Sequence, residues 1–130
     1  MAIWLIDDLR DFRPGVVPLH ERVTISRTSR DASKNLWTLP KGEYFDQVWF
    51  DHDLGIVDGE DDTTIDLARS LSLLVSQGRI GVGMVLIHSA NPVGAGNLFS
   101  IFKTGEIPVV RVDARDYLTN VITKGGDFKK

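Results

Sequence analysis

Short apolar runs that end in polar residues recur along the chain and predict buried strands. Five segments have this character: 3–6, 22–27, 48–50, 84–87 and 109–112. Most are continuous apolar stretches, which are typical of strands that a parallel sheet buries on both faces. Polar residues follow three of these runs directly, so the ends of those strands are the first places to look for chemistry.

Apolar residues at helical spacing separate several of the predicted strands. The clearest helix begins at Thr63 or Thr64 and ends at Gly78, with apolar residues three or four positions apart. Three shorter helices are predicted over about 29–39, 95–103 and 114–123. Residues 124–130 follow as a frayed tail.

Two segments are predicted to lack regular structure. Residues 9–20 contain two prolines and a glycine at spacings that break a helix. A loop bearing Arg10 and Arg13 is therefore expected where an α/β fold usually has its first helix. The acidic stretch 58–62 is predicted to be a solvated turn.

The order of these elements predicts the fold class. Strands that alternate with helical segments favour a parallel sheet, because parallel neighbours need crossover connections. We therefore expect one domain over 1–130, a small doubly wound α/β fold with a parallel sheet of five strands. Ligands of such folds bind outside the carboxyl ends of the strands. That edge is where functional residues are expected.

Composition narrows the function without identifying it. The chain has 130 residues, of which 42% are hydrophobic and 25% charged, and this suits one globular domain. The absence of cysteine excludes disulfides, cysteine-ligated zinc and thiol nucleophiles. No membrane span or signal peptide is visible, so a cytoplasmic location is expected. A net charge of -3 disfavours binding to duplex DNA, although a local basic rim can still hold a short nucleotide.

Polar residues gather where three of the predicted strands end. They are Asp7, Asp8, Asp51, His52, Asp53, His88 and Ser89. If buried together, the four carboxylates would repel one another unless a cation neutralises them or some bind a proton. Oxygen ligands of this kind suit Mg²⁺ or Mn²⁺. The sequence predicts a metal site here, and the alternative is that these aspartates are solvated turn and cap residues.

Two of the three histidines, His52 and His88, fall beside this acidic group, whereas His20 is predicted to lie on the surface. Histidine can donate or accept a proton near neutral pH, or bind a metal. One histidine of the pair can take a proton from water while the other gives one to an oxygen leaving phosphorus. The alternative is that either histidine is structural. Arg10 and Arg13 can clamp a phosphate, or can be solvated loop residues.

The same residues resemble those of a receiver domain of two-component signalling. Asp7 and Asp8 resemble the acidic metal-binding pair of that family, and Asp51 resembles its phosphoacceptor. The dipeptide at 58–59 has the spacing that receivers commonly show, and Ser89 matches the serine or threonine that closes their fourth strand. Two departures argue against phosphoacceptor signalling. The region of the fifth strand offers Arg111 in place of a lysine, and a loop replaces the first helix.

Segments 4–8, 51–55 and 88–92 resemble, more specifically, the receiver-like family assigned to cyclic-phosphate processing, which occurs in phages and bacteria near RNA-repair systems. The resemblance covers about 3–115. It implies receiver (flavodoxin-like) topology with the first helix replaced by a loop. It also implies that the acidic pocket has gained histidines and performs phosphoester chemistry.

We therefore predict a metal-assisted phosphoesterase that acts on a cyclic phosphate, at an RNA end or on a small nucleotide. Asp7, Asp8, Asp51 and Asp53 are the predicted metal ligands, for Mg²⁺ or Mn²⁺. His52 and His88 are the predicted acid and base, in either order. Ser89 and Asn91 would orient phosphate oxygens, with help from Arg10 or Arg13. The alternatives are a noncatalytic binding module and a receiver phosphorylated on Asp51.

Overall fold

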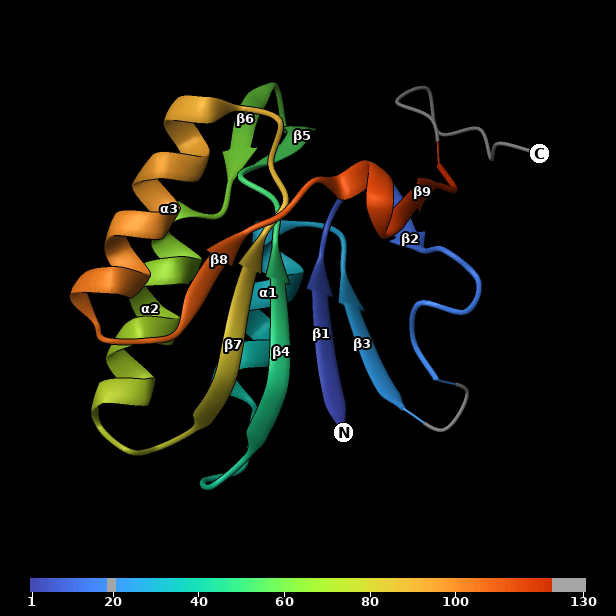
Figure 1. Cartoon of the computed structure of the whole chain (residues 1–130). Helices are drawn as coiled ribbons and strands as arrows, with labels where there is room; N and C mark the ends of the chain where they lie inside the picture. Colours follow the sequence, from blue (N-terminus) through green and yellow to red (C-terminus); the bar gives the residue numbers. More distant parts are fainter. Residues whose placement is uncertain (19–20, 123–130) are drawn as a thin grey trace.

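A five-stranded parallel sheet forms the centre of the protein (Figure 1), as a computed structural model describes it over residues 1–18 and 21–122. Its strands are β1 (Ala2–Ile6), β3 (Arg22–Ser26), β4 (Tyr44–Phe50), β7 (Gly81–Ile87) and β8 (Val109–Arg111). Their spatial order is β3-β1-β4-β7-β8, and every neighbouring pair is parallel. Since this is the strand order of receiver-like doubly wound folds, the predicted fold class is confirmed.

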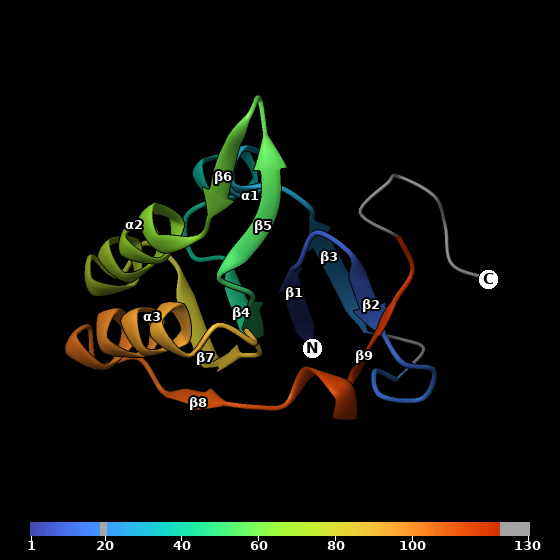
Figure 2. The same ribbon diagram turned by 90° about the horizontal axis from the view of Figure 1, so that it is seen from above.

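The α-helices of the described residues all pack on one face of the sheet (Figure 2). They are α1 (Ser29–Trp37), α2 (Ile65–Ser76) and α3 (Pro92–Thr104). The core between helices and sheet contains Trp4, Phe50 and Phe102, which are almost fully buried. Burying each large side chain contributes about 2 kcal/mol. None of these helices combines the length and the apolar character needed to cross a membrane.

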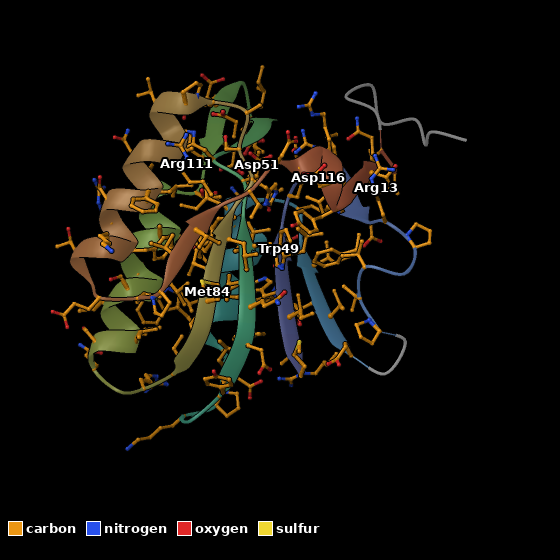
Figure 3. The ribbon with its side chains drawn as sticks, viewed as in Figure 1. Arg13, Trp49, Asp51, Met84, Arg111 and Asp116 are labelled. Atoms are coloured by element: carbon orange, nitrogen blue, oxygen red, sulfur yellow. The ribbon has the colours of Figure 1, made fainter. Side chains whose placement is uncertain are left out.

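The opposite face of the sheet is covered by a different kind of structure. Strand β2 (Arg10–Phe12) pairs in antiparallel fashion with β9 (Leu118–Asn120), and the short 3-10 helix η1 (Ala114–Asp116) precedes β9. Trp49 lies on this face (Figure 3), with the rings of Phe12 and Tyr117 at centroid distances of 5.2 and 5.3 Å. These aromatic contacts hold the β2–β9 ribbon against the sheet.

The ribbon corrects two predictions. The predicted loop at 9–20 contains β2 at 10–12. In place of the helix predicted over 114–123, the described part, 114–122, contains only η1 and β9 as regular elements. Strands of three residues are too short to show a hydrophobic period, and their pairing partner lies about a hundred residues away in the sequence. The frayed tail predicted at 124–130 and the predicted surface position of His20 lie outside the described residues.

A β-hairpin extends from the carboxyl edge of the sheet and replaces the predicted solvated turn. It consists of β5 (Asp53–Val57) and β6 (Glu60–Thr63). Asp58 and Gly59 connect the two strands with φ values of 52° and 80°, which is the two-residue turn that an Asp-Gly pair favours. Asp62 fastens the hairpin to α1, because its carboxylate accepts hydrogen bonds from the backbone N–H and the hydroxyl of Ser29.

Candidate metal centre

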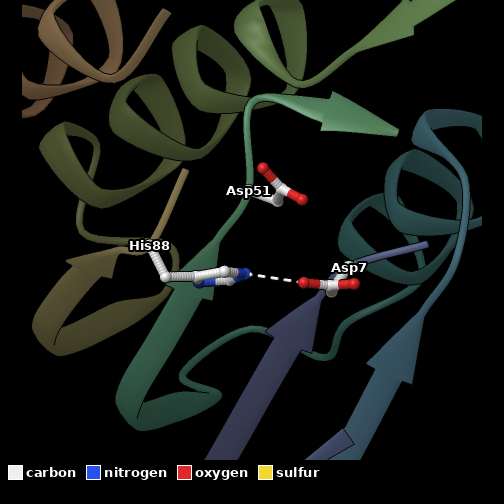
Figure 4. Close-up of side chains that lie close together, drawn as sticks. All are labelled: Asp7, Asp51 and His88. Atoms are coloured by element: carbon white, nitrogen blue, oxygen red, sulfur yellow. Dashed lines mark hydrogen bonds and ion pairs between the residues drawn. The ribbon is translucent and has the colours of Figure 1, made fainter. Parts of the chain in front are cut away.

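Three buried side chains converge at the carboxyl edge of the sheet (Figure 4). Asp7, Asp51 and His88 follow β1, β4 and β7, and each offers one ligand atom within 4.8 Å of the other two. A hydrogen bond of 2.9 Å joins Nε2 of His88 to Oδ2 of Asp7. Figure 4 shows the Asp51 carboxylate beside this pair.

Backbone hydrogen bonds explain why these three residues stand side by side. The N–H of Asp51 donates to the carbonyl of Ile6 at 3.1 Å, and the N–H of His88 donates to the carbonyl of Phe50 at 3.0 Å. The parallel ladder therefore continues one residue beyond the apolar part of each strand. The sheet itself sets the separation of the functional side chains.

Asp7 is a carboxylate stabilised in its ionised form. Its Oδ1 accepts the backbone N–H groups of Leu9 and Arg10, both at 2.8 Å. Burial raises the pKa of Asp7, but His88 and these two N–H groups together outweigh burial and lower it below the usual value. An ionised Asp7 only accepts hydrogen bonds, so Nε2 of His88 is the atom that carries the proton between them.

The pKa of Asp51 is shifted in the opposite direction from that of Asp7. Burial raises the pKa of its carboxyl to about 6, and nearby Asp7 and Asp8 add to this effect, whereas His88 and Arg10 oppose it. Within residues 1–18 and 21–122, no hydrogen bond reaches the Asp51 carboxylate oxygens. A buried carboxylate of this kind is one that a divalent cation would stabilise.

The donor set fits a hard divalent cation. Two buried carboxylates supply oxygen ligands, and a ring nitrogen of His88 lies within 4.8 Å of both. Carboxylate oxygens suit Mg²⁺ and Mn²⁺, and an imidazole nitrogen is a further ligand that Mn²⁺ accepts. Of the four predicted ligands, Asp7 and Asp51 belong to the cluster, whereas Asp8 and Asp53 line the adjoining hollow and His88 is the third member of the cluster.

The cluster opens into a hollow of about 440 Å³, which we call the acidic hollow. The carboxylates that line it are Asp7, Asp8, Asp51, Asp53, Asp61 and Asp62. Asp61 and Asp62 come from the β5–β6 hairpin. They were not predicted as site residues, although the Asp-Gly pair at 58–59 indicates a hairpin. The hairpin also brings Gly55 against Asp8, and a Cβ on that glycine would lie 3.1 Å from Oδ2 of Asp8.

Ser89 and Asn91 also line the acidic hollow, as predicted residues of the site. Asn91 is held at both ends of its amide. Its Oδ1 accepts the N–H of Gly94 as the N-cap of α3, and its Nδ2 donates to Asp53 at 3.1 Å. The Ser89 hydroxyl accepts the N–H of Asn91 at 3.1 Å. Asn91 therefore fixes both the start of α3 and the position of Asp53.

His52 lies outside this arrangement. Its ring packs against Gly94, where a Cβ would come within 2.4 Å of the ring. Nδ1 of His52 is 2.9 Å from Oδ1 of Asp53. Neither His52 nor His88 is among the described residues that line the acidic hollow, and His88 lines a neighbouring hollow with Ser89 and Arg111. The structure therefore brings His88 into the cluster and leaves His52 behind Asp53.

The two predicted phosphate clamps separate in a similar way. Arg10 lines the acidic hollow, with Nη1 3.6 Å from Oδ2 of Asp7. Arg13 does not line it and donates from Nε to the backbone carbonyl of Arg115 at 2.9 Å. Arg111 ends β8 and is exposed on the other side of Ser89.

Comparison with known families identifies the kind of receiver. The model of the cyclic-phosphate processing receiver domain matches residues 1–104. The chain belongs to this family. The matched region runs from β1 to the end of α3, and so it contains every residue that lines the acidic hollow. No curated protein and no solved structure matches the chain.

Proposed function

We propose that this protein is a metal-assisted phosphoesterase that opens a cyclic phosphate diester, at an RNA end or on a small nucleotide. The observation that carries the proposal is the convergence of Asp7, Asp51 and His88 within 4.8 Å, where Asp7 and Asp51 line a polar hollow. Membership of the cyclic-phosphate processing receiver family supports the substrate class.

Asp7 and Asp51 would hold the cation from the floor of the hollow, with Asp8 beside them. When bound, a divalent cation polarises the phosphoryl oxygens and offsets the charge of the carboxylates. Ser89 is in reach of the same space through its position on the hollow wall. The Ser89 hydroxyl accepts a hydrogen bond from the N–H of Asn91, so its own O–H is available to donate to a phosphate oxygen.

Hydrolysis of the ring forms one bond from a water oxygen to phosphorus and breaks one ring P–O bond. The water loses a proton, the departing ring oxygen gains one, and a phosphomonoester with a free hydroxyl results. We assign the donated proton to Nε2 of His88, which holds it toward ionised Asp7. We assign the acceptor to Asp53, because Asp53 lines the hollow and is held on both oxygens by His52 and Asn91. His52 is then a positioning residue.

The test is turnover of adenosine 2',3'-cyclic phosphate with Mg²⁺ or Mn²⁺, followed by ³¹P NMR. Replacing His88→Gln or Asp51→Asn should lower kcat by on the order of a hundredfold. The matched control is Asp66→Asn, which changes an almost fully exposed aspartate on α2 and should leave kcat unchanged. No turnover of any 2',3'- or 3',5'-cyclic phosphate would contradict the proposal and favour a noncatalytic binding module.

A second measurement separates the roles of the two histidines. If His52 only positions Asp53, His52→Asn should lower kcat but keep both limbs of the pH–rate profile. Loss of one limb would restore the predicted acid–base pair of His52 and His88. Formation of a base-labile aspartyl phosphate on Asp51, after incubation with a small phosphoryl donor and Mg²⁺, would favour the signalling receiver instead.

A further inference from the structure

A second hollow lies beside the acidic one and has the opposite charge. It measures about 310 Å³ and is formed by β2, η1 and β9. Arg10, Arg13 and Arg115 line it, and no carboxylate occurs among the described residues of its lining. We call it the arginine hollow. Figure 3 shows Arg13 at the end of the ribbon away from the helices, with Asp51 nearer the centre of the edge.

Neutral oxygen atoms accept the hydrogen bonds from the Nε atoms of Arg10 and Arg13. Nε of Arg13 donates to the carbonyl of Arg115 at 2.9 Å, and Nε of Arg10 donates to the side-chain oxygen of Asn120 at 3.3 Å. Two of the three have an acidic partner that does not line this hollow: Arg115 pairs with Asp113 at 2.7 Å, and Arg10 lies 3.6 Å from Asp7. Each guanidinium therefore keeps N–H donors for an anion.

Arg10 connects the two hollows, because it lines both of them. Its Nη1 is buried, lies 3.6 Å from the Asp7 carboxylate and has no hydrogen-bond partner in the described part of the chain. A ligand in the acidic hollow would thus border directly on the arginine hollow. The ribbon that builds the arginine hollow includes 114–120, which lie beyond the region that the family match covers.

We propose that the arginine hollow binds a second phosphate group of the same substrate, separate from the cyclic phosphate. Guanidinium groups bind phosphate through forked donors, whereas the carboxylates of the acidic hollow would repel an additional phosphate. The second group is either the 5'-phosphate of a mononucleotide or the phosphodiester that precedes a terminal cyclic phosphate. This inference rests on the proposed function for the position of the cyclic phosphate.

The test compares three ligands by isothermal titration calorimetry with Mn²⁺. They are 5'-hydroxyl adenosine 2',3'-cyclic phosphate, its 5'-phosphorylated form, and a dinucleotide that ends in the cyclic phosphate. At least one of the two-phosphate ligands should be preferred roughly tenfold, as expected for one added charge-assisted contact. If the titration heat saturates, the ligand only binds, and the preference is a ratio of Kd values. If heat continues because the ligand is turned over, the preference is a ratio of kcat/KM values.

Arginine variants test whether the arginine hollow causes the preference for a second phosphate. Arg13→Gln and Arg115→Gln should bring the ratio close to one, and Arg115 is 87% exposed, so its replacement leaves the core intact. The matched control is Arg79→Gln, an exposed arginine just before β7 at the opposite edge of the sheet, which should keep the ratio. Thermal unfolding checks that each variant is folded.

Each outcome has one meaning. Which two-phosphate ligand is preferred identifies the source of the second phosphate. Equal affinity for all three ligands overturns the second subsite and leaves the proposed function standing. A preference that survives in both Arg13→Gln and Arg115→Gln, or that Arg79→Gln removes, also overturns it. Binding of none of the ligands overturns the subsite and the proposed function together.

Discussion

The acidic hollow and the arginine hollow share Arg10 but are built in different ways. Six carboxylates line the first, which forms where neighbouring parallel strands end. Three arginines line the second, which forms where β2 meets β9, with Arg10 hydrogen-bonded to a residue 110 positions away. The comparison shows that one edge of a sheet can present a group of carboxylates and a group of arginines side by side. The sheet supplies the first group, and an added ribbon supplies the second.

The pKa values of two aspartates show how the electrostatics of the two hollows differ. Burial, with Asp7 and Asp8 nearby, raises the pKa of Asp51 to about 6. The hydrogen bonds and charge of Arg115 lower the pKa of Asp113 to about 2, and Asp113 lies beside the arginine hollow. The acidic hollow therefore places like charges together in a buried site, whereas the arginine hollow is bordered by a solvated ion pair. Like charges that are buried together favour binding of a counterion.

The largest effect is expected from the cation. If only the folded protein binds Mn²⁺ in the acidic hollow, a concentration one hundred times Kd should stabilise it by about 2.7 kcal/mol and raise Tm by roughly 10 °C. Thermal unfolding with Mn²⁺ and with a chelator measures this shift. Asp51→Asn should remove most of it, while Arg13→Gln should keep it. If millimolar Mn²⁺ left the Tm of the unsubstituted protein unchanged, the acidic hollow would not be a cation site.

A smaller effect is expected from Asp51 without metal. Because its folded pKa is raised above the unfolded value of 3.8, the stability that this group contributes is complete below pH 3.8 and is lost as the pH rises through about 6. Asp51→Asn should therefore increase the free energy of unfolding at pH 7 by roughly 1 to 3 kcal/mol, and should give little change at pH 4. Urea unfolding at both pH values measures the difference.

Asp113→Asn is the matched control, since the pKa shift of Asp113 has the opposite sign. Its contribution is present above pH 3.8 and is lost as the pH falls toward 2, so this variant should show no increase in stability at pH 7. If Asp51→Asn lowered stability at pH 7, the Asp51 carboxylate would have a structural hydrogen-bonding role and the electrostatic contrast would fail.

The smallest effect concerns the wall behind Asp53. Alanine normally stabilises a helix relative to glycine by about 1 kcal/mol, and Gly96→Ala should do so because nothing lies within 4 Å of the added Cβ. Gly94→Ala in the same helix should instead destabilise the protein by roughly 1 to 2 kcal/mol, since the methyl group would meet the His52 ring. Chemical denaturation of both variants measures the pair. Equal stabilisation by both substitutions would show that His52 moves freely.

Part of the fold and of the site was predictable because it depends on local pattern. Short apolar runs separated by helical periods indicated a parallel sheet, and the rule that ligands bind at the carboxyl ends of such strands selected Asp7, Asp51 and His88. The hairpin at 53–63 was also within reach of sequence reasoning. Its Asp-Gly pair is a strong turn signal, but the surrounding carboxylates favoured the interpretation of a solvated turn.

The remaining features had no local signal. Strand β2 has three residues, its partner β9 also has three, and the Trp49 contacts that hold them join segments far apart in sequence. Residues 114–123 have enough helical character to suggest a helix, and tertiary pairing overrides it. The arginine hollow depends on that pairing, so Arg115 was not identified beforehand.

By itself, the sequence determined which residues end the strands. The reason is that each apolar run is a local property of the chain, and the strand ends where that run ends. Only the tertiary structure decided where their side chains lie. His88 directly follows β7 and is level with Asp51, whereas His52 is one residue further along the chain. The missing Cβ of Gly94 admits the ring of His52 against α3, while Asp7 holds His88 in the cluster. Side-chain direction follows from packing and charge between distant segments, and no local pattern contains that information.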